Sequence, residues 1–284
     1  MPTYAQLLGP AHPMSTAKGP NTKARLPRKA RAGKKARLSK PMTKAVQSLI
    51  RREADTKFVA QSIQRPDGGV TLNSYAGFSS AINTVNEIYA CIPQVPVGGT
   101  TSSCTRVGDH ISPTKCLIDL NIVATASNAM GSVDKMVHVF VLTSKSVKSL
   151  DNYTAIPITQ LLDIGNGTNG PFNGTSMSQT LPVNTQDFTV LHHKAFRMTK
   201  GLGLQNTSIA TSAVITPAST FRRLRLNIKL PKKLTYADDS TNYPVNSAPF
   251  LVIGYTSCDS AGDSAPTAVD TYVEGRVQMW YKDM

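Results

Sequence analysis

The chain has 284 residues, and its 31 Lys and Arg outnumber its 17 Asp and Glu to give a formal net charge of +14. That length can bury a sizeable core as one domain, and the clean apolar run FLVI at 250–253 is far too short to cross a bilayer. The composition therefore favours a folded, strongly basic protein whose partner is acidic, and a membrane partner is not expected. No secretory signal is visible in the sequence.

The positive charge is concentrated at the N-terminus. Residues 1–52 contain thirteen Lys or Arg and no Asp or Glu, which leaves 18 basic against 17 acidic residues in the rest of the chain. Few large apolar groups accompany these charges, so we expect residues 1 to about 40 to form a disordered basic arm. Cations on a flexible segment neutralise phosphates without reading sequence. The predicted nucleic-acid-binding residues of this region are Lys18, Lys23, Arg25, Arg28, Lys29, Arg31, Lys34, Lys35, Arg37, Lys40, Lys44, Arg51 and Arg52.

The arm ends in a short amphipathic pattern. An apolar stripe with helical spacing predicts a helix near 41–53, with Ser39 as its cap and Pro41 in its first turn. The stripe consists of Met42, Ala45, Val46, Leu49 and Ile50. So short a helix is marginal alone in water, so it is either frayed or ordered where the stripe packs on a neighbouring subunit. We assign residues 1–57 to the arm and helix and residues 58–284 to the folded domain.

The domain reads as all-β. Short runs with two-residue alternation, rich in Val, Ile and Thr, are separated by Gly, Pro, Asn and Ser. The runs are 85–92, 110–125, 136–143, 187–198, 220–230, 249–257 and 270–281. The run 187–198 is long enough to bend at His192-His193 into two strands. About eight strands with long connections predict an eight-stranded single jelly roll of two antiparallel sheets.

The longest connection, 144–186, contains two local signals. ITQLLDIG suggests one or two helical turns, and GNGTNGPFNGTS supplies three Asn-Gly pairs, which favour turns. We expect 163–180 to be an exposed loop, with Ile164, Phe172 and Met177 as its large apolar groups.

A second basic cluster lies at 221–234. Leucine and isoleucine alternate there with polar residues, so one strand face would pack in the core while the other presents cations. The cations are Arg223, Arg225 and Lys229. Two interpretations stay open, a solvated sheet face and a nucleic-acid contact that extends the arm.

Little in the sequence indicates an enzyme, a cofactor or a metal. Dinucleotide, phosphate-loop, zinc-protease and serine-hydrolase motifs are missing or incomplete. His192 and His193 are neighbours on a predicted strand and face opposite ways, which favours a structural or turn role. Asp238 and Asp239, and likewise Asp259 and Asp263, lie in predicted loops and could hold calcium at a subunit contact, but loop carboxylates are usually only solvated. We expect no catalytic residues.

Three segments resemble capsid proteins of circular, Rep-encoding single-stranded DNA viruses. They are RVGDHISPTKCLIDLNI (106–122), QDFTVLHHKAF (186–196) and AVDTYVEGRVQMWYKD (268–283), in family order behind a basic arm. The resemblance implies a single jelly-roll coat protein like that of satellite tobacco necrosis virus, in about sixty or more copies of one icosahedral shell. It also implies that Lys18 to Arg52 is the genome-binding arm, and that catalytic residues are lacking.

The predicted function is therefore a self-assembling coat protein that packages single-stranded DNA. Coat proteins of small or satellite RNA viruses share this fold, so RNA is the alternative genome. A non-assembling nucleic-acid-binding module would place aromatic residues among the basic ones, yet residues 18–57 contain none. The expected partners are further copies of the chain, the genome and, because an arginine-rich arm reads as a nuclear import signal, the host import machinery. The expected locations are the virion and the host nucleus.

Overall fold

The computed structural model describes residues 39–53, 56–67, 76–77, 79–98, 104–124, 135–198, 220–257 and 271–283. The chain divides into two compact units, Met1–Ala45 and Val46–Met284. The nine basic residues from Lys18 to Arg37 lie outside the described residues, as does the predicted disorder of most of the arm.

A helix occupies the amphipathic segment. Helix α1 spans Lys40–Glu53, close to the predicted 41–53. Its first turn is closed by Ser39, whose carbonyl oxygen accepts from the Thr43 amide at 2.9 Å and from the Thr43 hydroxyl at 3.1 Å. The stripe residues Met42, Val46 and Leu49 are exposed. These three large apolar side chains therefore add nothing to the hydrophobic core of the chain.

Six strands form the first sheet, and all of its pairs are antiparallel. The strands are β1 (Thr56–Ser62), β2 (Ala76–Gly77), β4 (His110–Ala124), β9 (Thr220–Asn227), β10 (Leu234–Thr235) and β12 (Thr271–Asp283). Strands β12 and β4 lie at the centre; β1 and β2 pair with β12, and β9 and β10 pair with β4. Strand β1 was not among the predicted runs, because Phe58 and Val59 are its only large apolar residues.

Four strands form the second sheet, in the order β3 (Tyr89–Ala90), β11 (Pro249–Ser257), β5 (Lys135–Ser144) and β8 (Phe188–Met198). The prediction that 187–198 bends into two strands is wrong. Val141 pairs with His192 and Leu142 pairs with Val190, so Leu191 is an extra residue in one continuous strand. A bulge accommodates such a residue with a local bend and keeps the ladder intact.

The strand order confirms an all-β, jelly-roll-like fold. The order β1-β12-β4-β9 in one sheet and β3-β11-β5-β8 in the other interleaves early and late segments of the chain. Such interleaving of two antiparallel sheets is the double Greek-key arrangement of a jelly roll. The described residues contain twelve strands rather than the predicted eight. Strand β8 is one strand and not two, and five strands lay outside the predicted runs: β1, β2, β6 (Leu162–Gly165), β7 (Thr168–Gly170) and β10.

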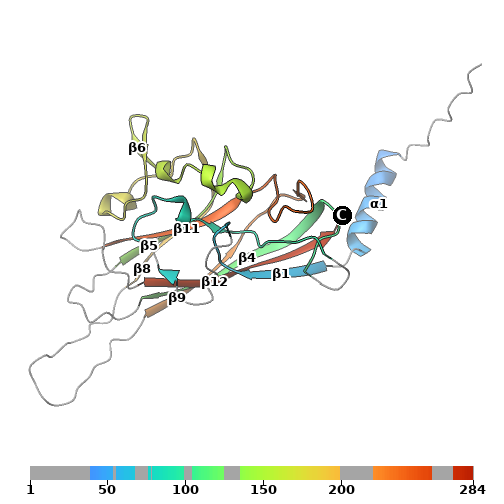
Figure 1. The fold of residues 1–284 in the computed structure, drawn as a ribbon, viewed down its shortest axis with the longest axis horizontal. Helices are drawn as coiled ribbons and strands as arrows, with labels where there is room; N and C mark the ends of the chain where they lie inside the picture. The colour runs from blue at the N-terminus through green and yellow to red at the C-terminus, as the bar shows by residue number, and fades with distance from the viewer. Residues whose placement is uncertain are drawn as a thin grey trace, which may run out of the picture. The chain divides into compact units, whose positions relative to one another are not determined.

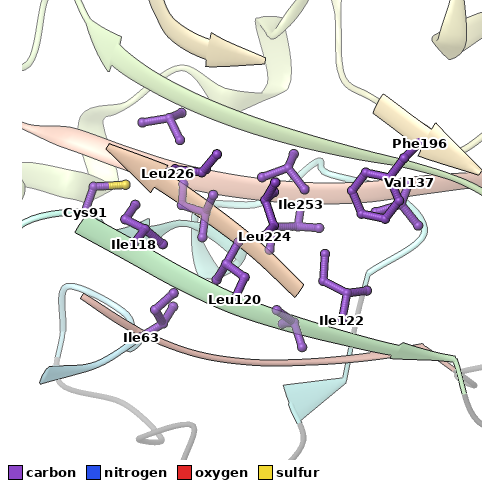
Figure 2. Close-up of a cluster of buried hydrophobic side chains, with 14 of the residues drawn as sticks. Ile63, Cys91, Ile118, Leu120, Ile122, Val137, Phe196, Leu224, Leu226 and Ile253 are labelled. Atoms are coloured by element: carbon purple, nitrogen blue, oxygen red, sulfur yellow. The ribbon is translucent and has the colours of Figure 1, made fainter. Parts of the chain in front are cut away.

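The two sheets enclose one main core. Figure 2 shows Ile118, Leu120 and Ile122 of β4 facing Val137 of β5 and Ile253 of β11, with Leu224 and Leu226 of β9 beside them. Each side chain is fully or almost fully buried. Burying a side chain of this size stabilises the fold by about 1.5–3 kcal/mol.

A covering segment, residues 145–187, packs on the outer side of the second sheet, where Figure 1 shows it beyond β11 and β5. It contains the 3-10 helices Leu150–Ala155, Ile158–Gln160 and Ser176–Gln179, and the hairpin of β6 (Leu162–Gly165) and β7 (Thr168–Gly170). The predicted turn is confirmed at Asn166, with φ of 53°, and Gly167, with φ of 72°.

The prediction that 163–180 is wholly exposed is wrong at Phe172. Ile164 and Met177 are exposed, but Phe172 is fully buried. The Phe172 carbonyl oxygen accepts from the Ile82 amide at 2.6 Å, and its ring contacts Phe140 edge-on at 6.2 Å. A second core therefore joins the covering segment to Phe140, Phe250 and Val252 of the sheet.

Candidate nucleic-acid interface

The predicted nucleic-acid-binding residues fall on two described elements. Lys40, Lys44, Arg51 and Arg52 lie on α1, and Arg223 and Arg225 lie on β9. Lys229 lies just beyond the end of β9 and is exposed. The predicted alternation on β9 is confirmed, because Leu224, Leu226 and Ile228 are buried while the three cations before, between and after them are exposed.

Arg223 and Arg225 share one carboxylate on the neighbouring strand. Asp119 of β4 accepts from Arg223 Nε at 2.9 Å and Arg223 Nη2 at 2.5 Å, and from Arg225 Nη2 at 3.3 Å. The Arg223 hydrogen bonds, followed by those of Arg225, lower the pKa of the Asp119 carboxyl to about 2. Asp119 therefore stays ionised at neutral pH and leaves the three side chains with one net positive charge.

This trio belongs to a wider surface, which we call the bare face. It is the outer side of the first sheet, formed by the outward side chains of β1, β12, β4 and β9. In one row across it, Ser62 pairs with Arg276, Arg276 with Asp119, and Asp119 with Arg225. Glu274, Asn121 and Arg223 form the next row. A shallow hollow lies between these two rows. Charged and amide groups therefore fill the middle of the bare face.

Aromatic residues lie at one end of the bare face. Phe58 of β1 pairs in register with Trp280 of β12, and Trp280 with Lys115 of β4. The Phe58 and Trp280 ring centroids are 4.9 Å apart, and Lys115 Nζ lies 5.2 Å from the Trp280 ring centroid. Phe58 is 40% exposed. A tilted aromatic pair with a cation above one ring is thus open to solvent.

Two further aromatic residues, Tyr272 and Phe221, lie in a row at the opposite end of the bare face. Both pair in register with Val123, from β12 and from β9. Phe221 is 75% exposed.

The sequence analysis does not predict this aromatic surface, because residues 18–57 of the basic arm contain no aromatic residue and Phe58 lies one position beyond them. One signal was available: Trp280 alternates with the buried Met279 and Tyr281 and so must face outward.

Of the two neighbouring histidines of β8, His193 packs on a ring of the sheet, whereas His192 is exposed. His193 stacks on Phe140 at 4.3 Å, and its Nε2 lies 3.4 Å from Nδ1 of His138. Burial, followed by the neighbouring His193, lowers the pKa of His138 to about 4. In the part of the chain that the structure describes, no cluster of three or more His, Cys, Asp or Glu side chains could hold a metal ion. Asp238 instead accepts from the amides of Ser240 and Thr241 in a turn.

Arg106, which opens the first capsid-like segment, is a buried clamp. It is fully buried and donates to the carbonyl oxygens of Val95, Gly108, Asp238 and Thr241. Its guanidinium also lies 4.3 Å from the ring centroid of Tyr236. Two of the acceptors, Val95 and Gly108, lie before β4, and the other two, Asp238 and Thr241, lie in the loop after β10. The planar guanidinium group of Arg106 therefore holds these two parts of the chain together. Its role is structural.

Comparison with known proteins gives little. No protein-family model matches the chain, and no curated protein matches it in sequence. The solved structure of PNGF-II has a TM-score of 0.30 and 11% identity over 83% of this chain, which spans 36% of the PNGF-II chain. A full particle of Israeli acute paralysis virus, heated to 63 degrees, has a TM-score of 0.25 and 10% identity, covering all of this chain and 88% of the viral one. At such TM-scores neither likeness assigns a fold or a function. None of the described helices is long and apolar enough to span a membrane.

Proposed function

We propose that this chain is a viral coat protein that assembles into an icosahedral shell and packages a single-stranded genome through its basic arm. The observation that carries the proposal is the division of charge. Residues 1–52 carry thirteen cations and no carboxylate. Residues 53–284, which include the jelly-roll-like body, carry 18 basic and 17 acidic residues and are close to neutral. An enzyme or a soluble binding domain would not need to separate a strongly basic arm from a nearly neutral body.

The arm suits bulk neutralisation of phosphate. Thirteen charges in each of sixty subunits would offset on the order of 780 phosphates inside a closed shell. Release of counterions from the nucleic acid would drive this association without sequence specificity. The role is structural rather than catalytic.

Assembly has support from α1. Met42, Val46 and Leu49 form one stripe of large apolar side chains, and all three are exposed in the single chain. Contiguous apolar groups on a surface are typical of sites that bind a partner. A neighbouring subunit is the partner that a shell provides.

DNA is the favoured genome because of the three capsid-like segments, and an RNA genome is the alternative. An arginine-rich arm would also serve nuclear import, which suits DNA that replicates in a nucleus. Neither the fold nor the arm distinguishes the two nucleic acids.

The test is electron microscopy of the purified full chain, followed by nuclease digestion of nucleic acid extracted from its particles. Uniform spherical particles whose content is degraded by DNase and resists RNase are expected. The reverse digestion pattern would assign an RNA genome. A monodisperse monomer at every salt concentration would refute the coat-protein proposal.

The arm can be tested separately by deleting residues 1–38, which removes nine cations and no described strand. We expect a folded body with reduced nucleic-acid uptake and a shallower dependence of uptake on salt. The matched control keeps all 284 residues and replaces the same nine cations with Gln. Equal loss in both variants would attribute uptake to charge; loss in the deletion alone would attribute it to arm length.

A further inference from the structure

The bare face combines an exposed aromatic pair with an excess of positive charge. Phe58 and Trp280 form an open aromatic pair at one end, with Lys115 over the indole. Positive groups outnumber negative ones along the same face. Its outward charged side chains in the rows between Trp280 and Phe221 are Lys115, Arg223, Arg225, Arg276, Asp119 and Glu274.

The aromatic pair is poorly explained as core packing. The inward residues of the same strands, Val59 and Met279, are buried, so Phe58 and Trp280 lie on the opposite side of the sheet. Adjacent apolar groups that are exposed together are typical of sites that bind a partner. An exposed ring with a cation beside it suits a ligand that has a flat aromatic face and a negative charge.

We propose that the bare face binds single-stranded nucleic acid, with an unpaired base stacked on the Phe58–Trp280 pair and the adjacent phosphate beside Lys115. The proposal rests on the coat function, since the packaged genome is the expected ligand, and it adds a base contact to the phosphate contacts of the arm. Stacking on aromatic side chains is tolerant of sequence because every base has a π face. A single strand is required because paired bases keep their faces stacked in the duplex.

The dimensions of the face allow several nucleotides. Trp280 and Tyr272 are eight residues apart on β12, which at about 3.3 Å per residue is roughly 26 Å. Arg276 lies midway between them, with Arg225 and Arg223 in its row and the next. A strand that stacks at Trp280 can therefore keep its phosphates near cations along the face.

A second copy of the chain fits the face less well. A two-fold contact through this surface would bring the same excess of Arg and Lys on each copy against the other, and like charges facing each other across an interface disfavour association. The charge of the face is instead complementary to phosphate.

The chain contains a built-in reporter, because Trp280 is its only tryptophan. Intrinsic fluorescence of the full chain is titrated with a short oligothymidylate and, separately, with an abasic oligonucleotide of equal length and charge. The arm binds both through phosphate, whereas only the first can stack. Saturable quenching by oligothymidylate, with little change from the abasic strand, is expected.

Variants then identify the surface. Phe58→Leu keeps an apolar side chain and removes the ring, and we expect it to weaken the oligothymidylate affinity about tenfold without changing the abasic affinity. Trp280→Leu should weaken the oligothymidylate affinity in the same way, and Trp280→Phe, which keeps a ring, should bind like the parent. Because these two variants lack the tryptophan, their binding is followed by the anisotropy of a labelled oligonucleotide. Leu191→Ala is the matched control, because Leu191 is 39% exposed on the other sheet. It should leave both affinities unchanged.

The outcomes separate this site from the coat function. Particles that package nucleic acid, in which Phe58→Leu changes neither quenching nor affinity and Trp280→Leu leaves the affinity unchanged, would overturn the stacking site and leave the coat function intact. A full chain that binds neither oligonucleotide would overturn both. Fluorescence that responds to protein concentration and not to oligothymidylate would show that the face is a contact between copies, which also overturns the proposal.

Discussion

The two sheets of the jelly-roll-like body differ in what lies on their outer sides. Strand β5 is buried on both faces along most of its length, because the core lies on one side and the covering segment on the other. Strand β12 alternates between buried and partly exposed residues, because its outer side belongs to the bare face. Among the residues that the structure describes, the outer side of the second sheet is therefore covered, whereas the bare face is open to solvent.

Sequence composition follows this difference. KMVHVFVLTS of β5 is a nearly continuous apolar run, whereas TYVEGRVQMWYKD of β12 places polar groups between its core residues. A continuous run indicates a strand covered twice, and alternation indicates a strand covered once. Substitutions on the two outer faces should accordingly have very different effects on stability.

The largest difference is expected between two phenylalanines. Phe172→Ala, under the covering segment, removes a fully buried ring that contacts Phe140 and His138. Its free energy of unfolding should fall by about 3–5 kcal/mol. Phe221→Ala, on the bare face, removes a ring that is 75% exposed and should change stability by less than about 0.5 kcal/mol. Urea unfolding followed by circular dichroism measures both, and similar losses would show that the two faces are equally covered.

An acid titration should separate the faces next. Burial keeps His138 neutral with a pKa of about 4, while the unfolded chain takes up this proton near pH 6.5. Between these values the unfolded state binds more protons, so stability should fall by roughly 2–3 kcal/mol as the pH drops from 6.5 to 4. His193, which packs on His138, also has a pKa lowered by burial and acts in the same direction.

On the bare face the corresponding group is Asp119, with a pKa of about 2. Its contribution to stability is present above the usual carboxyl range near pH 4 and is lost as the pH falls toward 2. Between pH 7 and pH 4 the unfolding temperature should therefore fall because of His138 on the covered side, before the protonation of Asp119 contributes. His138→Leu should flatten that part of the curve, whereas the exposed His192→Gln on the same sheet should not. An unchanged curve in His138→Leu would contradict the assignment.

How far the sequence predicts this arrangement depends on the range of the contacts. Alternation and apolar runs locate β4, β5, β11 and β12, because each pattern is local to its strand. The burial of Phe172 is not local: it follows from a bridge to Ile82 and from Phe140 of another sheet strand. Its neighbours, rich in Asn-Gly pairs, indicate an exposed loop. Propensity was therefore overridden by packing between distant segments.

The candidate interface shows the same limit. Alternation alone predicts that the side chains of Arg223, Arg225 and Trp280 face outward. Their partners are not, because Asp119 and Phe58 reach them only through the register of β4 with β9 and of β1 with β12. Strand β1 carries too few apolar residues to be recognised by itself.

A smaller effect is expected at Gly254 of β11. A Cβ atom added there would lie 2.7 Å from Phe172 Cε1 and 2.9 Å from Ile82 Cδ1, so Gly254→Ala overpacks the covered side. We expect a loss of about 1–2 kcal/mol. Asn121→Ala on the bare face, where the side chain is exposed, is the control and should lie within about 0.5 kcal/mol of the parent. If Gly254→Ala left the free energy of unfolding unchanged, the covering segment would have to shift away from the added methyl group at little cost.

The smallest effect on stability, and the most direct one on binding, is expected from Asp119→Asn. The substitution removes the carboxylate that Arg223 and Arg225 share, so the bare face gains one positive charge while its inward packing is unchanged. Ion pairs with exposed arginines contribute little to folding, and the unfolding midpoint should stay close to that of the parent. Affinity for oligothymidylate should rise at low salt, and the plot of log affinity against log salt should steepen by about 0.7 for the single strand. The control is Asp163→Asn, which removes an exposed carboxylate from the hairpin of the covering segment. If the bare face binds the strand, only Asp119→Asn changes the slope; equal changes in both variants would mean that overall charge, and not this face, sets the affinity.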